Sequence, residues 1–213
     1  IGFSKKIFKV PKSPKTFYKI EKKIRDLFNI DVKELLILQT GKLSLDKRPD
    51  LTITAANYPL KNIKGNILFV GPYSKDEMLF LKRIFFKNAN ENWSLHFSNN
   101  VNYKDLRDFY IASDLLSYPG GASLSCIEGA ASGTKSIVAR TPEGIERSKF
   151  GISKVPSDCT DNSFIEEISK EIHLLDKKKI DKFKRYQNAI KISKLVEDFS
   201  YTKVCKRLIK IST

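Results

Sequence analysis

The sequence predicts an α/β protein whose central layer is a Rossmann-like, doubly wound parallel sheet. Two observations predict this fold class: short apolar runs alternate with segments of helical length, and the runs are apolar almost throughout. Strands that alternate with helices form parallel sheets, and strands covered on both faces carry apolar residues on both sides. We therefore expect helices on both faces of the sheet and ligand-binding loops at the carboxyl ends of the strands.

Five apolar runs are the expected strands: Leu35–Gln39, Ile67–Val70, Leu95–Ser98, Leu115–Tyr118 and Ser136–Ala139. Apolar residues at helical spacing predict helices at Phe17–Phe28, Ser74–Asn88 and Tyr103–Ala112. The C-terminal third is expected to be helical, at Asn162–Leu175, Lys177–Lys194 and Tyr201–Ile211. We also expect a helix at Pro49–Leu60, although Thr52, Thr54 and Pro59 weaken its pattern.

The composition excludes several classes of protein. With 213 residues, of which 41% are hydrophobic and 30% charged, the chain can bury a core and is neither disordered nor fibrous. No apolar stretch approaches the roughly 18 residues of a membrane span. Three scattered cysteines and two histidines argue against a disulfide framework or a metal site, and we expect no metal and a cytoplasmic location.

The charge favours anionic partners. The sequence has 39 Lys and Arg residues against 24 Asp and Glu residues, a net charge of +15. Nucleic acid, an anionic membrane and phosphate-bearing small molecules all fit this charge. The lysine-rich segments Lys5–Lys23 and Lys177–Lys194 support a basic binding surface. The basic helix Asp176–Lys194 could rest on anionic lipid, although such a helix is more often a solvated face. No nucleic-acid motif or aromatic stacking platform is evident, so no specific nucleic acid is expected.

The loop after the first strand is the first candidate site. Gly41 permits a tight turn, and Lys42, Lys47 and Arg48 follow it at the carboxyl end of the strand. Two lysines five residues apart can converge on a diphosphate and neutralise charge on a leaving group. The alternative is a solvated basic loop, which the loop taken alone favours.

A glycine-rich turn after the fourth strand is the second candidate site. Gly120 and Gly121 lead into a helix whose first free amides, near Ser123–Ser125, form an anion site. Glu128 lies about a turn inside this helix, where it could accept hydrogen bonds from a sugar's hydroxyl pair; the alternative is a solvent-exposed glutamate. The segment is neither the G-x-G-x-x-G nor the Walker motif.

A third loop, Arg140–Glu146, follows the fifth strand. It could cover the same crevice as the other two loops. The alternative is an ordinary turn that uses Pro142 and Gly144.

The segments Val101–Asp114, Leu115–Gly133 and Ile137–Ala139 resemble the donor domain of the "group 1" retaining glycosyltransferases, which have the GT-B fold. Gly41-Lys42-Leu43 with Lys47 resembles the family's Gly-Arg-Leu-x-x-x-Lys. The resemblance implies a single GT-B half with extra C-terminal helices. It divides the chain into a basic lead-in and helix at 1–34, which would be an interdomain connection, a donor-binding domain at 35–195, and a C-terminal helix at 196–213.

The resemblance also implies roles for individual residues. Lys47 matches the lysine that contacts the donor diphosphate, Lys42 stands where arginine is usual, and both are the expected catalytic residues. Glu128 matches the second glutamate of E-x7-E, which binds the donor ribose. The expected donor-binding residues are Gly41, Gly121, Ser123, Leu124, Ser125 and Glu128. The nucleotide sugar is the substrate, and no cofactor is expected.

Two departures from the family pattern affect recognition of the donor. Gly120 stands where the first glutamate of E-x7-E, which often contacts the sugar, would be. Lys42 cannot make the two-pronged contact of arginine.

The resemblance implies metal-independent, retaining transfer from a donor such as a UDP-sugar to a glycan or lipid-linked acceptor, in polysaccharide or lipopolysaccharide assembly. The expected location is the cytoplasm, with peripheral attachment at the inner face of the membrane. Because an acceptor domain is missing, we expect one in the same chain or in a separate subunit, and little or no transfer without it. The alternatives are a basic binding module on the same scaffold and an epimerase that shares the donor domain.

Overall fold

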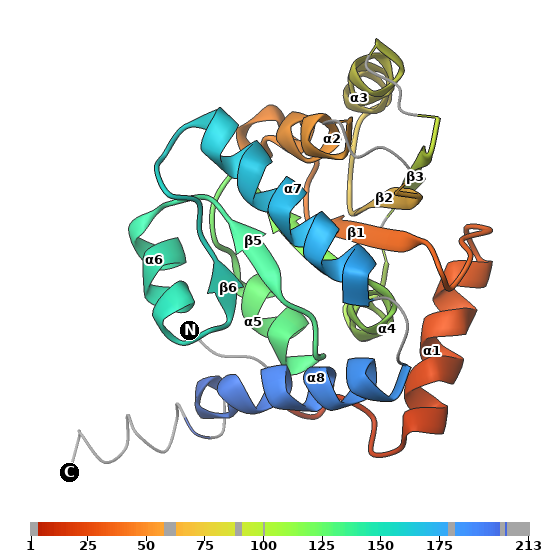
Figure 1. Ribbon diagram of the computed structural model, residues 1–213, viewed down its shortest axis with the longest axis vertical. Helices are drawn as coiled ribbons and strands as arrows, with labels where there is room; N and C mark the ends of the chain where they lie inside the picture. Colours follow the sequence, from red (N-terminus) through yellow and green to blue (C-terminus); the bar gives the residue numbers. More distant parts are fainter. Residues whose placement is uncertain are drawn as a thin grey trace.

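The computed structural model describes residues 4–57, 63–87, 91–99, 101–178, 182–200 and residue 203. Its centre is a six-stranded parallel sheet with strand order β3-β2-β1-β4-β5-β6. The strands are β1 (Leu35–Thr40), β2 (Gly65–Val70), β3 (Trp93–Ser98), β4 (Leu115–Tyr118), β5 (Ser136–Val138) and β6 (Ser153–Lys154). Helices cover both faces of the sheet (Figure 1), so the predicted fold class is confirmed.

The described residues form these helices: α1 (Pro14–Asp26), α2 (Pro49–Asn57), α3 (Lys75–Lys87), α4 (Leu106–Ala112), α5 (Leu124–Ala131), α6 (Pro142–Lys149), α7 (Asp161–Lys178) and α8 (Lys182–Leu195). Two short 3-10 turns are η1 (Leu45–Lys47) and η2 (Glu197–Phe199). None of the helices in the described part of the chain is long and apolar enough to cross a bilayer.

Each face of the sheet has its own core. Leu36 and Leu38 of β1 pack in a cluster with residues of α1, α4 and α5, whereas Leu35 and Ile37 pack in a second cluster with α2, α3 and α7. Successive side chains of a strand point to opposite faces, so four consecutive apolar residues supply both cores. Figure 1 shows α2 and α7 on one side of β1 and α4 and α5 on the other. Because helices cover both faces of the sheet, a ligand can reach the sheet at the ends of its strands.

Several predicted helices differ in their bounds; among them, the helix expected at Tyr103–Ala112 begins only at Leu106, after a turn at residues 103–105. Helix α1 begins at Pro14 rather than Phe17, because the Ser13 side chain accepts a hydrogen bond from the Thr16 amide and Pro14 suits the first turn. Helix α2 forms although Thr52 weakens its pattern, since the Thr52 hydroxyl donates to the Gln39 side chain at 2.9 Å. The expected helix Lys177–Lys194 is divided between α7 and α8.

Sequence reasoning missed two elements, α6 and β6. Helix α6 starts at Pro142, where the alternative of an ordinary turn is wrong, because Thr141 caps the helix through the Gly144 amide at 3.1 Å. Strand β6 is two residues long, too short to form an apolar run. The predicted helix at residues 201–211 lies, apart from residue 203, outside the described residues.

A buried ionic cluster ties α1 to the core. The Arg25 side chain is fully buried and donates to the Asp114 carboxylate at 2.7 Å and to the Ala112 carbonyl at 3.1 Å. Arg185 of α8 lies 3.5 Å from the other Asp114 oxygen and pairs with Glu21 of α1. Burial acts to raise the pKa of Asp114, but the two guanidinium groups and the Leu36 amide outweigh it and lower that pKa. The cluster fixes α1 and α8 against the end of α4.

Candidate functional site

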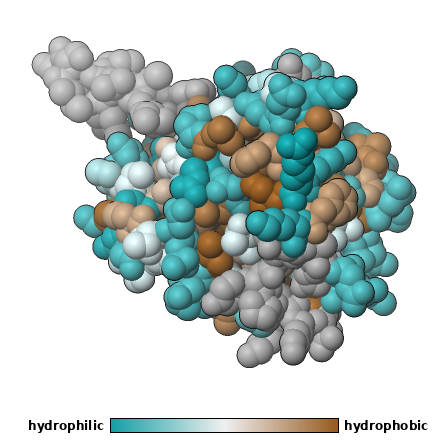
Figure 2. All heavy atoms as spheres, turned by 90° about the horizontal axis from the view of Figure 1, so that it is seen from above, coloured by the Kyte–Doolittle hydropathy of each residue, from teal (hydrophilic) through white to brown (hydrophobic). Residues whose placement is uncertain are grey.

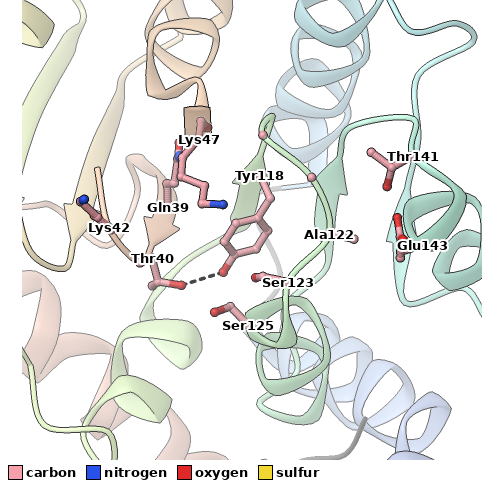
Figure 3. Close-up of a pocket in the computed structure, with 13 residues that line it drawn as sticks. Gln39, Thr40, Lys42, Lys47, Tyr118, Ala122, Ser123, Ser125, Thr141 and Glu143 are labelled. Atoms are coloured by element: carbon pink, nitrogen blue, oxygen red, sulfur yellow. Dashed lines mark hydrogen bonds between the residues drawn. The ribbon is translucent and has the colours of Figure 1, made fainter. Parts of the chain in front are cut away.

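A pocket of about 320 Å³ opens at the carboxyl ends of β1 and β4 (Figure 3). These strands are neighbours in the sheet, at the point where the strand order reverses, and such switch points are where open α/β sheets bind ligands. The pocket is lined by Gln39, Thr40, Gly41, Lys42, Lys47, Tyr118, Gly120, Gly121, Ala122, Ser123, Ser125, Thr141 and Glu143. The predicted loops after the first, fourth and fifth strands therefore meet at one site.

The N-terminus of α5 supplies hydrogen-bond donors to this pocket. Ser123 precedes the helix in an extended conformation, and its side chain makes no capping hydrogen bond to the helix. The Cys126 amide donates to the Ser123 carbonyl at 3.2 Å, but no capping side chain covers the start of the helix, where the positive end of the helix dipole favours an anion. Of the residues expected to bind the donor, Ser123 and Ser125 line the pocket, whereas Leu124 does not.

The loop after β1 brings two lysines to the pocket. Gly41 turns the chain with a φ of 112°, a conformation that favours glycine. The Lys47 amine lies 3.3 Å from the Asp46 carboxylate, and its side chain is 54% exposed. In Figure 3 the Lys47 amine points toward Tyr118, whereas the Lys42 amine points away from it. Gly41, Lys42, Lys47 and Gly121, which were expected from the sequence as site residues, all line the pocket.

Gly120 packs directly under the lysine loop. A Cβ atom at Gly120 would lie 2.5 Å from the Asp46 carbonyl oxygen and 2.5 Å from the Lys47 Cα. Real Cβ contacts are longer, and both neighbours are backbone, so any side chain at this position would displace the loop. The Gln39 amide group also donates to the Lys47 carbonyl at 3.2 Å. The departure at Gly120 thus has a physical cause, since the loop occupies the space of a side chain.

A cluster of hydroxyl groups lies where β1 and β4 end. The Thr40 hydroxyl is 2.8 Å from the Tyr118 hydroxyl and 3.2 Å from that of Tyr110. Burial raises the pKa of both tyrosines, so their hydroxyl groups stay protonated. Sequence reasoning missed Thr40 and Tyr118 as site residues. A polar residue at the end of each of two expected strands was the available signal.

Glu128 lies one turn further along α5 and is 3% exposed. The alternative of a solvent-exposed glutamate is therefore wrong, but Glu128 is also not among the residues that line the pocket. Its carboxylate accepts a hydrogen bond from the Tyr103 hydroxyl. Burial raises the pKa of Glu128, and the hydrogen bonds from Tyr103 and Tyr110 offset part of this rise.

The loop after β5 completes the wall of the pocket with Thr141 and Glu143. Thr141 caps α6, and Glu143 lies in the first turn of that helix. The Glu143 carboxylate accepts hydrogen bonds from its own backbone amide and from the Thr141 hydroxyl, and these lower its pKa. Arg147 of α6 donates to the Ser123 carbonyl and so links α6 to the start of α5. Within the described part of the chain, no three His, Cys, Asp or Glu side chains are grouped to hold a metal ion.

No protein-family model and no curated protein matches the sequence. Solved structures do match the fold. The Anabaena protein HepE in complex with UDP and glucose is 16% identical with a TM-score of 0.73, over 99% of this chain and 55% of that chain. A glycosyltransferase from Rickettsia africae is 17% identical with a TM-score of 0.73, over 99% and 54% of the two chains.

WaaG, a glycosyltransferase involved in lipopolysaccharide biosynthesis, is 16% identical with a TM-score of 0.65, over 90% of this chain and 50% of that chain. The present chain thus spans about half the length of the solved structures that it matches. The resemblance noted in the sequence is borne out at the level of fold. The chain has the Rossmann-like fold of one half of a GT-B glycosyltransferase.

Proposed function

We propose that this chain binds a nucleoside diphosphate sugar and serves as the donor half of a retaining, hexosyltransferase-type glycosyltransferase. The observation that carries the proposal is the pocket in which the uncapped N-terminus of α5 lies opposite the Lys47 loop. Both parts attract the same ligand group, a diphosphate. Structures of HepE, which shares the fold, were solved with UDP and with UDP-glucose, and this supports UDP as the nucleotide.

In the proposed mechanism, the diphosphate lies between the α5 amides and the two lysines. Lys47 and Lys42 stabilise the negative charge that develops on the departing nucleoside diphosphate, which makes a metal ion unnecessary. The acceptor hydroxyl attacks the anomeric carbon from the face that the diphosphate leaves. The leaving phosphate takes the acceptor's proton, so no side-chain base is required.

The nucleoside is proposed to extend from the pocket along α5 toward Glu128. The Glu128 carboxylate can accept hydrogen bonds from the two ribose hydroxyls once the Tyr103 hydroxyl gives up its place or shares it. Tyr103 is 44% exposed, although its ring packs against Phe8 of the core, so the hydroxyl has access to solvent on one side. This placement of the nucleoside would connect Glu128, which lies outside the pocket, with the phosphate site one turn earlier in α5.

The acceptor is proposed to be a glycan or lipid-linked glycan, held by an acceptor domain in the same chain or in a separate subunit. The isolated half would then bind donor with little or no transfer. This fits polysaccharide or lipopolysaccharide assembly on the cytoplasmic side of a membrane. No specific nucleic acid is proposed as a partner.

Helix α3 supports a second proposed role, attachment to an anionic membrane. Its outer face exposes Leu79, Phe80 and Phe86 together with Arg83 and Lys87. Figure 2, which views the end of the molecule that carries α3, shows apolar and hydrophilic residues mixed on this surface. Aromatic and basic side chains on one helix favour binding at a lipid headgroup layer. Binding to vesicles with and without phosphatidylglycerol tests this role, and equal binding to both would exclude it.

Calorimetric titration with UDP, GDP, ADP and their monophosphates, in low and moderate salt without added metal, tests the donor proposal. Saturable binding that prefers one base and a diphosphate, and that survives added salt, supports a donor site. Weak binding to every nucleotide that disappears with salt would instead indicate a basic surface. In that case the basic-module alternative would replace the donor proposal.

A further inference from the structure

The pocket contains both signs of charge. Lys42 and Lys47 come from the loop after β1, whereas Glu143 comes from the start of α6. Among the described residues that line the pocket, Glu143 is the one with a carboxylate. Figure 3 shows Glu143 and Lys47 on opposite sides of Ser123 and Tyr118. The pocket is therefore divided into a cationic side and an anionic side.

The position of Glu143 is fixed relative to the phosphate site. Thr141 caps α6 at the Gly144 amide, 3.1 Å away, and Arg147 of the same helix donates to the Ser123 carbonyl at the start of α5. A Cβ atom at Gly144 would lie 2.4 Å from the Ala139 carbonyl oxygen, so glycine allows α6 to start close against β5. The carboxylate thus belongs to an element that is tied to α5 rather than to an unattached loop.

The two sides of the pocket suit different parts of a nucleotide sugar. The diphosphate is anionic and is stabilised by the lysines and the α5 amides, but a carboxylate repels it. The sugar is neutral and presents hydroxyl donors, and an ionised carboxylate can only accept hydrogen bonds. Position 120 cannot supply this carboxylate. It is a glycine, and the backbone of Asp46 and Lys47 fills the space that a side chain would need.

We infer that Glu143 is a specificity-determining residue for the transferred sugar: its carboxylate accepts a hydrogen bond from a hydroxyl group of that sugar. The inference rests on the proposed donor function of the pocket. It assigns to a residue of α6 the recognition that no side chain at position 120 can provide. The competing explanation is that Glu143 only stabilises the N-terminus of α6, where acidic residues are favourable.

The test compares Glu143→Gln with the wild type and with Glu146→Gln, an exposed glutamate of the same helix that does not line the pocket. Each protein is titrated with UDP and UDP-glucose, GDP and GDP-mannose, and ADP and ADP-glucose. For the pair that the wild type binds, Glu143→Gln is expected to lower the affinity for the nucleotide sugar by about tenfold relative to the affinity for the nucleoside diphosphate. Glu146→Gln should leave this ratio unchanged.

Deoxygenated donors identify the hydroxyl group. Removing the hydroxyl that Glu143 contacts should weaken binding to the wild type by about tenfold, but should have little further effect on Glu143→Gln. If Glu143→Gln changes the affinities for nucleoside diphosphate and nucleotide sugar by the same factor, the inference is wrong and Glu143 serves α6 alone. If the wild type binds no nucleoside diphosphate, the proposed function itself fails.

Discussion

The hydroxyl of Tyr103 donates a hydrogen bond to the carboxylate of Glu128. Tyr103 is 44% exposed, whereas Glu128 is 3% exposed, so the tyrosine covers a carboxylate that would otherwise face the outside of α5. The Tyr103 ring packs edge-on against Phe8 at a centroid distance of 5.1 Å. The carboxylate proposed to bind the ribose is thus held by a group that the ligand must replace or share.

Glu128→Gln should stabilise the fold and lower the affinity of the protein for a nucleoside diphosphate. Burial raises the pKa of Glu128 above its ordinary value of 4.5, so the folded state holds the proton more tightly than the unfolded state. The stability that results is complete below pH 4.5 and is lost as the pH rises through the folded pKa. Urea denaturation should therefore show that the advantage of Glu128→Gln over the wild type increases from pH 4 to pH 8.

The effect of Glu128→Gln on ligand binding is measured with pyrophosphate as the control ligand. Glu128→Gln should lower the affinity for a nucleoside diphosphate by about tenfold and leave the affinity for pyrophosphate unchanged, because pyrophosphate has no ribose. Calorimetry with both ligands gives the comparison. Equal effects on the two ligands would show that Glu128 does not contact the nucleoside.

Lys47→Ala should weaken nucleoside diphosphate binding by about 10- to 100-fold, because a charged hydrogen bond to phosphate is lost. The fold should be unaffected, since the side chain is 54% exposed and pairs with the neighbouring Asp46. Lys33→Ala is the matched control: Lys33 is exposed and precedes β1, at the opposite edge of the sheet from the pocket. An equal loss in both variants would mean that only the overall charge of the chain matters.

Gly120→Glu should weaken diphosphate binding rather than restore a missing contact. Its Cβ would lie 2.5 Å from the Lys47 Cα, so the loop that carries Lys47 must move. Overpacking of this kind costs about 1–3 kcal/mol, and Gly120→Ala should show most of the effect. Thermal unfolding and UDP titration of both variants measure it. Tighter binding by Gly120→Glu than by the wild type would show that the loop yields and that a glutamate fits there.

Asp114→Asn should lower the free energy of unfolding by about 3–5 kcal/mol, because it leaves Arg25 and Arg185 without their carboxylate in a buried site. The folded pKa of Asp114 lies below the ordinary value of 3.8, so the wild type keeps this stability above pH 3.8 and loses it as the pH falls through the folded pKa. The control is Asp26→Asn, which breaks the exposed pair with Lys22 and should cost about 0–1 kcal/mol. Similar losses in both variants, measured by urea denaturation, would contradict the structural role of the cluster.

The sequence predicts the central strands well because β1, β2, β4 and β5 are buried throughout. Every residue of β1 and β2 is buried, which requires the continuous apolar runs that the prediction used. The same reasoning could not find β6, whose two residues are Ser153 and Lys154, or α6, whose segment is mostly polar. These elements are defined by tertiary contacts and by the Thr141 cap rather than by periodicity.

The position of the candidate site could be predicted where its residues lie in loops that directly follow strands. Lys47 and Ser123 follow strands and could be placed at a common edge of the sheet from the fold class alone. The burial of Glu128 could not be foreseen, since it depends on Tyr103, which precedes it by 25 residues and comes from another loop. Thr40 and Tyr118 stand at the ends of expected strands, but the contact between their hydroxyl groups forms only in the folded sheet, where β1 pairs with β4.

The central claim is that a nucleoside diphosphate binds between the Lys47 loop and the N-terminus of α5. Backbone amide chemical shifts, recorded during a titration with UDP in moderate salt, test it residue by residue. The account predicts saturable shifts concentrated at Gly41, Gly121 and Ser123–Ser125, and the Lys47→Ala variant should need about 10- to 100-fold more UDP to reach them. Shifts spread over the lysines of α1 and α8, or no shifts at the start of α5, would contradict it.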